Sequence, residues 1–479
     1  MRADAKKSKI VGAVAVHQET FCRMSDAIWS YAELPLEEHK SAELVARTLE
    51  ANGFEVTRGV AGLPTAIVAS WSNGTGKPVV GLMGEYDALP MLSQKAGIPR
   101  QDPLVPGAPG HGCSHNTMCA VQGLAAVSLK EIMQKYNIDG TIKLFGCPAE
   151  EILISRPYMI RAGLFDHVDA VIDCHGEDSL KIPAGTEGTA CISFMVTFRG
   201  KTAHSGSSPW KGRSAADAVE LMHAGTERMR EHLPITQRSH WVTLEGGEAP
   251  NVVPDRASTW YYVRDVDENI RENFQWMQDC AKGAALMTQT NYELKVLGAV
   301  HQRFHNTALA ELIFENMKQV KLPKYSAEEE AYALEIQKTL GFPRKGMTFK
   351  PEIIRTQMAP PQKGGSSDVG DVTLIAPTAT VKYPVRVPGS YSHHWSVTSA
   401  ALGSIARKGI VTGAAVVAFS AFDLLTNPAV LGKIRSEFEA LSKERPYRTF
   451  LPDDAEPPFG IYSAIQEKYR SALEKFYII

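Results

Sequence analysis

Two residues that could ligate a metal ion stand two positions apart in the sequence Gly-His-Gly-Cys-Ser-His-Asn. Side chains at positions i and i+2 diverge on an α-helix, so Cys113 and His115 can converge only in a loop or an extended segment. Residues 117–136 are apolar at helical spacing, and Asn116 or Ser114 could cap the helix that they predict. The pattern therefore indicates a metal-binding loop that opens onto a helix.

Further ligand-type side chains follow three predicted strands at the points where the strands end. The strands and the side chains after them are 78–83 with Glu85 and Asp87, 141–147 with Glu150 and Glu151, and 170–174 with His175. Open α/β sheets bind ligands at the carboxyl ends of their strands, so these side chains are expected to lie together. His393 and His394 add two imidazoles from a fourth segment. Two divalent ions need about this many nitrogen, oxygen and sulfur donors.

Each of these signals has an ordinary structural explanation when it is taken alone. A histidine at a strand end more often makes a structural hydrogen bond, and two adjacent glutamates usually form a solvated surface. The two histidines beside Trp395 are equally compatible with core packing. The joint pattern favours a metal site. The adjacent glutamates then suggest a division of labour, in which one binds metal and the other transfers a proton.

The length of 479 residues exceeds what one hydrophobic core usually supports, so two domains are expected. A net charge of −2 without a basic stripe argues against a nucleic-acid partner. Seven scattered cysteines indicate reduced thiols and a cytoplasmic location. Lysines before the apolar run 10–16 resemble a signal peptide, but the helical pattern continues to Tyr31 and favours a first helix. The apolar stretch 410–425 is too short to span a bilayer, so we expect a buried helix and no membrane partner.

The order of predicted elements indicates an α/β fold, with a mixed sheet covered by helices on both faces. Residues 1–186 and 299–479 form the larger domain. Residues 187–298 follow the β-α-β-β-α-β order of an inserted ferredoxin-like (split βαβ) domain. In the last part of the chain, helices are expected at 306–320, 327–340, 397–407, 410–425 and 461–475, with a loop at 341–370 and a strand at 378–384.

Four ordered motifs carry a resemblance to a known family. They are Gly84-Glu-Tyr-Asp-Ala-Leu-Pro90, Gly110-His-Gly-Cys-Ser-His-Asn116, Pro148-Ala-Glu-Glu151 and Gly200-Lys-Thr-Ala-His-Ser205. Together they resemble the aminoacylase/carboxypeptidase family of dinuclear metallohydrolases, and within it the branch of hippurate hydrolases and auxin-conjugate amidohydrolases. In that branch a cysteine replaces the usual bridging aspartate, and Cys113 matches that cysteine.

The resemblance implies a role for each matching residue. Glu150 matches the general base, and Asp87 matches the aspartate that orients a metal ligand. His204 matches a small-domain histidine that reaches into the active site of a partner subunit, although by itself it reads as a surface loop residue. Asn251 and Arg264 resemble residues that bind the substrate carboxylate, but Arg264 alone is equally a salt-bridging residue at a strand edge. The positions that match metal ligands are Cys113, His115, Glu151, His175 and His393.

The chain also departs from the family pattern. Ser114 stands where the family usually has glycine, and its side chain is expected to narrow the approach to the metals. Cys174 places a second thiol directly before a predicted ligand, and Glu85 stands where more distant relatives have a ligating histidine. His393 is preferred to His394 as the ligand because its spacing to the following tryptophan fits the family pattern.

The leading hypothesis is a metal-dependent amidohydrolase that cleaves the amide between an acyl or aroyl group and an amino acid such as glutamate. Its cofactors would be two divalent ions. A thiolate ligand favours zinc, and the resemblance also implies manganese or cobalt. The resemblance further implies a homodimer formed through the small domain, which would act as a lid. The competing hypotheses are a dipeptidase of the same fold, a hydrolase with Cys113 as nucleophile and His115 as base, and a non-catalytic member of a two-subunit enzyme.

Overall fold

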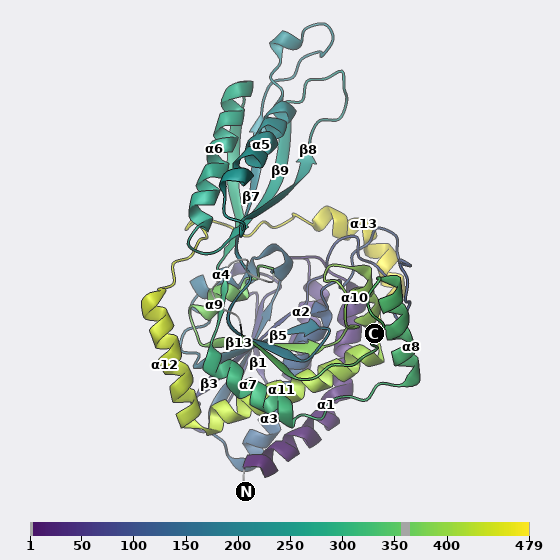
Figure 1. The fold of residues 1–479 in the computed structure, drawn as a ribbon, viewed down its shortest axis with the longest axis vertical. Coiled ribbons are helices and arrows are strands. Elements are labelled where there is room, and N and C mark those ends of the chain that lie inside the picture. The colour runs from purple at the N-terminus through teal and green to yellow at the C-terminus, as the bar shows by residue number, and fades with distance from the viewer. Residues whose placement is uncertain (1–2, 356–364, 479) are drawn as a thin grey trace.

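The computed structural model describes residues 3–355 and 365–478, which form a large α/β unit and a smaller unit that projects from it (Figure 1). The large unit is built on a nine-stranded sheet in the order β1-β2-β4-β3-β5-β13-β6-β11, with β12 paired to β6. The strands are β1 (Glu55–Arg58), β2 (Ile67–Asn73), β3 (Val79–Glu85), β4 (Gly140–Cys147), β5 (Ala170–Glu177), β6 (Lys181–Glu187), β11 (Arg303–His305), β12 (Glu352–Arg355) and β13 (Thr378–Pro384).

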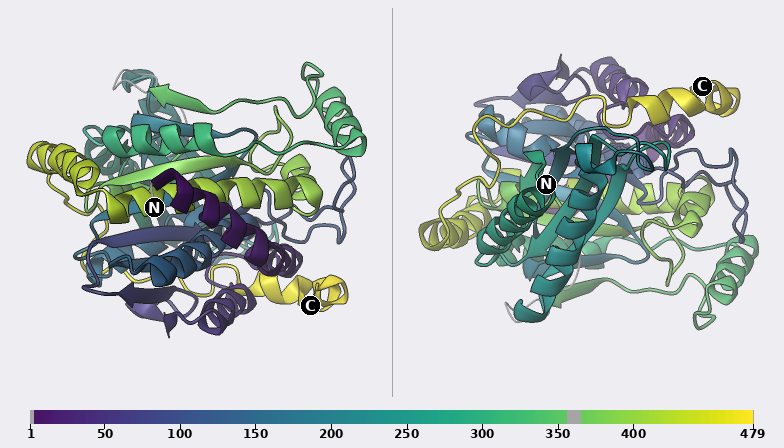
Figure 2. Two further views of the ribbon diagram at one scale, coloured as in Figure 1. Left: turned by 90° about the horizontal axis from the view of Figure 1, so that it is seen from below. Right: turned by 90° about the horizontal axis from the view of Figure 1, so that it is seen from above.

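Helices cover both faces of this sheet (Figure 2). One face packs against α1, α3, α7 and α11, and the other packs against α4 and α9. The predicted mixed sheet sandwiched by helices is therefore confirmed. The helices of the large unit are α1 (Ala3–Tyr31), α2 (His39–Ala51), α3 (Met118–Tyr136), α4 (Ser155–Arg161), α7 (Thr307–Gln319), α8 (Ala327–Thr339), α9 (Val369–Thr373), α10 (Trp395–Ala400), α11 (Ser404–Thr426), α12 (Pro428–Glu444) and α13 (Ser463–Leu473).

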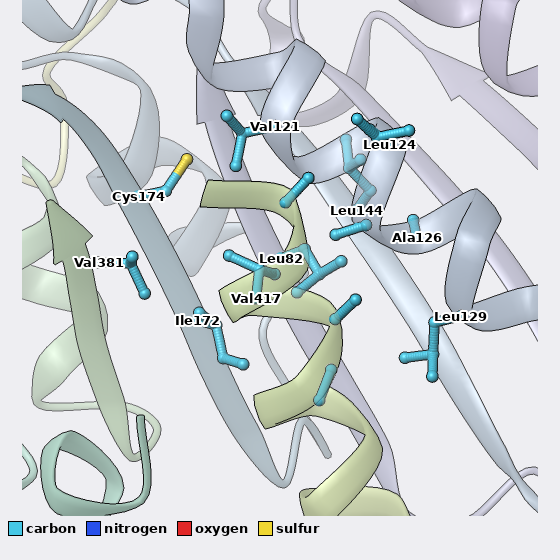
Figure 3. Packing of buried hydrophobic residues seen from close by; sticks show 14 of the residues in the cluster. Leu82, Val121, Leu124, Ala126, Leu129, Leu144, Ile172, Cys174, Val381 and Val417 are labelled. Carbon is cyan, nitrogen blue, oxygen red and sulfur yellow. The ribbon is translucent and has the colours of Figure 1, made fainter. Parts of the chain in front are cut away.

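The main core lies between the central strands and helices α3 and α11. Leu82, Ile172 and Val417 are fully buried there and point toward one another (Figure 3). Each such side chain contributes about 1.5–3 kcal/mol when it leaves water, so packing rather than helix propensity holds α11 in place. Among the described residues, α11 is the one helix long and apolar enough to cross a bilayer, but 83% of its apolar window is buried in the fold. The predicted core helix is confirmed, although at 23 residues it is longer than predicted and burial, not length, decides the assignment.

The smaller unit, which we call the lid, has a four-stranded antiparallel sheet in the order β10-β7-β9-β8. Two helices pack on one face of this sheet, and the predicted split βαβ arrangement is confirmed. The lid is inserted between β6 and β11, which pair with each other in the large sheet. Its elements are β7 (Ala190–Arg199), α5 (Ala215–Met229), β8 (Arg238–Glu245), β9 (Arg256–Asp265), α6 (Ile270–Thr288) and β10 (Asn291–Val300).

The last part of the chain differs from the prediction in its boundaries. The predicted break between helices at 408–409 is wrong, because the chain turns at Gly403, which has φ +119°, and α11 continues through Gly409. Gly409 instead permits close packing, since a Cβ there would lie 2.0 Å from the carbonyl oxygen of Pro384. The predicted loop at 341–370 also contains β12 and the start of α9, while its residues 356–364 lie outside the described part. Helix α12 was not predicted.

The topology brings the polar strand ends together. Strands β3, β4, β5 and β13 are mutually parallel along the sheet, so their carboxyl ends meet at one edge. Glu85 ends β3, Glu150 lies three residues after the end of β4, and His175 lies near the end of β5. Parallel strands connected by helices bind ligands at this edge, which is also the edge that the lid stands above.

Candidate metal centre

The loop before α3 places Cys113 and His115 at the sheet edge. In this loop Ser114 has a φ of +66°, which lies in the left-handed region. That conformation costs about 1 kcal/mol or more for a residue other than glycine, which explains the family preference for glycine at this position. The side chain of Ser114 is fully buried and does not line the cavity, so the expectation that it narrows the approach is wrong.

The predicted cap of the following helix is also wrong. A single 3-10 turn, His115–Thr117, leads into α3, and no side chain caps either element. The Asn116 amide instead donates hydrogen bonds to the Ser25 hydroxyl at 3.1 Å and to the Ala401 carbonyl at 3.0 Å. The loop is therefore tied to α1 and to the segment before α11, which fixes its position over the sheet.

Two groups of three potential metal ligands share the thiol of Cys113. One group is Cys113, His115 and His175, and the other is Cys113, Glu151 and His393. Within each group the ligand atoms lie within 4.8 Å of one another. The Cys113 Sγ is 3.4 Å from His175 Nε2, and His393 Nε2 is 3.2 Å from a Glu151 carboxylate oxygen. Atoms that bind one ion at 2.0–2.3 Å stand about 3–4 Å apart, so both spacings suit a shared ion.

The geometry distinguishes between the two adjacent histidines. The backbone N–H of His393 donates to the Gly112 carbonyl at 2.9 Å, which anchors this residue beside the Cys113 loop. The His394 ring instead accepts a hydrogen bond from the Ser396 backbone N–H at the start of α10. The structure thus brings His393 to the centre and uses His394 as a helix cap.

Asp87 connects two of the predicted ligands. One carboxylate oxygen lies 2.8 Å from His115 Nδ1, and the other accepts the backbone N–H of Glu151 at 2.9 Å. With Nδ1 held in this way, Nε2 of His115 points toward the centre. Asp87 thus makes the contact with His115 that an orienting residue would need, and its orienting role stays a prediction.

Glu150 belongs to neither of the two groups that share Cys113, but it forms a third possible ligand group with Glu85 and His115. Its Oε2 is 4.0 Å from His115 Nε2, and the residue is 9% exposed. Burial, followed by the negative charge of Glu85, raises the pKa of Glu150 well above its usual range. For Cys113, burial opposes ionisation, but the adjacent His115 and His175 imidazoles outweigh it and hold the pKa of the thiol well below its usual range.

A buried arginine that sequence reasoning missed neutralises the acidic side of the site. Arg156, on α4, is fully buried, with its guanidinium 2.6 Å from Glu85 and 3.8 Å from Asp173. It also pairs with Asp368, which follows the Gly-Gly-Ser-Ser stretch. Its position as the second residue of the helix that follows Glu150-Glu151 was the available sequence signal. This arginine keeps Glu85 at the edge of the centre and explains how a carboxylate is tolerated there.

The residues present fit two metal ions. Among the described residues, Glu85 Oε2, His115 Nε2 and Glu151 Oε1 are buried atoms that make no hydrogen bond, although Glu85 Oε2 and His115 Nε2 lie 3.2 Å apart. Buried polar atoms nearly always make a hydrogen bond, so three buried atoms at one place that make none indicate a missing ligand. A thiolate, imidazoles and a carboxylate are also the donors that a transition-metal ion prefers.

A cavity of about 640 Å³ lies over the centre and extends to the base of the lid. Arg264, on β9, lines this cavity as predicted for a substrate-binding residue. The structure does not bring His204 or Asn251 into the cavity of the same chain. Both are exposed and adjacent in the loops beyond the far end of β7, a ten-residue strand about 30 Å long.

Comparison with known proteins identifies the family. Residues 190–282, within the lid, match a peptidase dimerisation domain. Over 470 residues the chain is 33% identical to a subunit of the p-aminobenzoyl-glutamate hydrolase of Escherichia coli, covering 93% of this chain and 97% of that protein. The chain belongs to the M20 peptidase family. Like other M20 proteins, it is a hydrolase of peptide-like amide bonds. The resemblance carried by the four motifs is confirmed.

Other M20 relatives cover most of the chain. The human Xaa-Arg dipeptidase is 26% identical over 93% of this chain and 95% of that protein. A solved Bacillus subtilis structure, described as a dinuclear metal binding peptidase from the M20 family, is 18% identical with a TM-score of 0.56. It covers 86% of this chain and 99% of that one, and it supports the M20 fold.

Proposed function

We propose that this M20 enzyme is a dinuclear amidohydrolase that cleaves the amide bond of an N-acyl or N-aroyl amino acid. The observation that carries the proposal is the pair of three-ligand groups that share Cys113, with the carboxylate of Glu150 beside them. Similarity to the p-aminobenzoyl-glutamate hydrolase of Escherichia coli supports an aroyl-glutamate-like substrate.

The ligands fall into two sets. Cys113, His115 and His175 would hold one ion, and Cys113, Glu151 and His393 would hold the other. The bound ions would polarise the scissile carbonyl and make water a stronger nucleophile. Zinc suits the thiolate and imidazole donors, and manganese or cobalt are alternatives to be distinguished by metal content.

Glu150 acts as the general base and acid. Its carboxylate accepts a proton from the attacking water and delivers it to the leaving nitrogen. Asp87 holds His115 and the Glu151 backbone in place, so that the base and the ligands keep their relative positions. Arg264 binds the carboxylate of the amino-acid half of the substrate through its guanidinium.

A homodimer formed through the lid completes the site. His204 and Asn251 lie beyond the far end of β7 and outside their own cavity, and the lid matches a dimerisation domain. In a two-fold dimer both sites receive the same residues from the partner. His204 of one copy then stabilises the negative charge that develops on the carbonyl oxygen in the other copy.

Substitution of the base tests the chemistry. Glu150→Gln should retain both metals, as measured by elemental analysis, and lower kcat by about 10²–10⁴-fold on an N-aroyl-glutamate. Glu439→Gln, an exposed residue of α12, provides the matched control and should leave kcat unchanged. Hydrolysis at the normal rate by Glu150→Gln would refute the assignment. Full activity after exhaustive chelation would favour a Cys113 nucleophile instead.

Mixed dimers test the contribution of the second copy. Glu150→Gln chains and His204→Ala chains are each expected to be nearly inactive. After dissociation and equal mixing, half of the dimers carry one intact site, so activity should recover to about one quarter of the wild-type value. Absence of recovery, with dimers present by light scattering, would contradict a role for His204 across the dimer.

Similarity to the Xaa-Arg dipeptidases favours one alternative, a dipeptidase of the same fold. A panel of N-aroyl amino acids and dipeptides, assayed with the purified chain, distinguishes the two substrate classes. The same assay tests whether a second subunit is needed, because a chain that is inactive alone and active with a partner belongs to a two-subunit enzyme.

The expected cytoplasmic location agrees with seven cysteines that are all free thiols.

A further inference from the structure

The carboxylates in the outer part of the cavity are matched by cations. Glu187 contacts Lys382, Arg303 and His305. The charges of Arg303 and Lys382 and the hydrogen bond to His305 hold the pKa of its carboxylate well below the usual range, although burial opposes this. Glu177 pairs with Arg386 and lies 3.7 Å from Lys181. Neither glutamate is therefore available to attract a cationic substrate.

Two arginines in the same cavity, by contrast, have no carboxylate partner among the described residues. Arg238 and Arg264 both line it, and they stand directly opposite each other on the neighbouring antiparallel strands β8 and β9. Opposite residues project from the same face with Cβ atoms about 4.5–5.5 Å apart, and like charges there are destabilising. Within the part of the chain that the structure describes, no carboxylate pairs with either guanidinium.

The contacts that these arginines do make leave donors free. Arg238 uses Nη1 to donate to the carbonyls of Ile235 and Gln237, the latter at 2.6 Å. Arg264 uses Nε to donate to His240 Nε2 at 3.4 Å, and its guanidinium stacks 5.1 Å from the ring centre of Tyr262. The remaining N–H groups of both arginines need acceptors, and water supplies those only until a ligand displaces it.

We infer that Arg238 and Arg264 together bind two neighbouring carboxylates, so that the enzyme selects a dicarboxylic amino acid, with Arg238 contacting the carboxylate of its side chain. This inference rests on the proposed function, in which Arg264 binds the α-carboxylate. Because the two arginines are adjacent, the second carboxylate must lie within a few bonds of the first. It is therefore on the amino-acid half of the substrate, because the acyl half lies across the scissile amide.

The position of the pair relative to the metal ligands agrees with this reading. Tyr262 lies two residues before Arg264 on the same face of β9, and its hydroxyl donates to the Glu151 carbonyl at 3.3 Å. The arginine pair therefore lies two residues, or about 6–7 Å, farther along β9 than Tyr262, which contacts the metal-ligand segment. A substrate that places its amide at the centre would extend its amino-acid half toward the pair.

Charge also separates the two substrate classes suggested by the relatives. Selection of a C-terminal arginine would require a free carboxylate in the cavity outside the metal centre. The two glutamates there, Glu177 and Glu187, are both neutralised, whereas the unmatched charges are positive. The cavity is thus complementary to glutamate or aspartate and not to arginine.

N-benzoyl-glutamate and N-benzoyl-glutamine provide the test, because they have nearly the same shape and differ by one charge. The wild type should show a kcat/KM at least 10-fold higher for the glutamate compound. Arg238→Gln should lower kcat/KM for N-benzoyl-glutamate by about 10–100-fold and change the value for N-benzoyl-glutamine by less than about 3-fold. Arg238→Lys, which keeps the charge, should recover part of the preference. Arg228→Gln, on the exposed surface of α5, is the matched control and should behave as wild type.

The outcomes separate this inference from the proposed function. Hydrolysis of both compounds with no preference, or a preference that survives in Arg238→Gln, would overturn the inference while upholding the amidohydrolase. An effect of Arg238→Gln on N-(4-carboxybenzoyl)-alanine but not on N-benzoyl-glutamate would place the second carboxylate on the acyl half and also overturn it. Tighter binding of N-benzoyl-glutamate than of N-benzoyl-glutamine by calorimetry, without hydrolysis of either by the metal-loaded protein, would support the arginine pair and refute the proposed function.

Discussion

Replacement of Asp87 by alanine offers a direct test of how the centre is assembled. Asp87 is 1% exposed and accepts hydrogen bonds from two partners, His115 Nδ1 at 2.8 Å and the Glu151 backbone at 2.9 Å. Each partner is itself a predicted ligand. Removal of one carboxylate therefore releases two ligands that belong to different metal positions.

The magnitude follows from what the carboxylate holds. A hydrogen bond to a charged group contributes about 1.5–3 kcal/mol, and loss of an orienting carboxylate lowers metal affinity by about 10–100-fold, which is about 1.4–2.7 kcal/mol. The effect on the metal-free protein should be smaller. The negative charge of Asp87 raises the pKa of the buried Glu38, after burial itself, so its removal also relieves a repulsion.

The assay is metal titration of the chelator-treated protein, followed by thermal unfolding and elemental analysis. Asp87→Ala should bind both ions 10–100-fold more weakly, and excess metal should restore only part of the activity. Asp87→Asn should have a milder effect, because its carbonyl oxygen can still accept from His115. Asp454→Ala, at an exposed site near the C-terminus, is the control. Metal affinity within 2-fold of wild type in Asp87→Ala would refute the positioning role.

Three further predictions concern stability. Arg156→Met should lower the free energy of unfolding by about 3–5 kcal/mol in denaturant titrations, because it strands buried carboxylates, whereas Arg228→Met should change it by less than about 0.5 kcal/mol. Burial lowers the pKa of His301, but the hydrogen bond to Asp267 outweighs it and raises the pKa overall. The pair of His301 and Asp267 therefore stabilises the fold fully below about pH 6.5, and this contribution is lost as the pH rises through the folded-state pKa. The free energy of unfolding of the wild type should exceed that of His301→Gln by more at pH ~6 than at pH ~9. The opposite trend would contradict the charged pair. Gly409→Ala should lower the free energy of unfolding by about 1–3 kcal/mol, because the new methyl group would clash with β13. Gly432→Ala, on α12 with open space around it, should raise the free energy of unfolding by about 0.5–1 kcal/mol. Equal changes of the two variants in thermal unfolding would contradict the packing argument.

Much of the fold and of the centre follows from local sequence. The apolar run that forms β3 is continuous because both faces of this strand are covered, and this pattern is visible without a structure. The residue types at the ends of β3, β4 and β5, together with the two-residue spacing of Cys113 and His115, were enough to predict a metal site at that edge. Alternation along a strand and chemistry at its end are local properties, so the sequence determines them.

Other features depended on contacts between distant segments. Spacing to the following tryptophan favoured His393 over His394 only through the family pattern, and the physical basis of that choice is the contact of His393 with Gly112. The two contacts of Asp87 likewise result from packing against segments elsewhere in the chain. The opposition of Arg238 and Arg264 depends on the register between β8 and β9, which the intervening turn and a bulge set. A shift of one residue would send one guanidinium to the other face of the lid. The sequence alone thus determined which groups could do the chemistry, while the tertiary structure decided which of them face the same cavity, because register and long-range packing are not encoded in any local pattern.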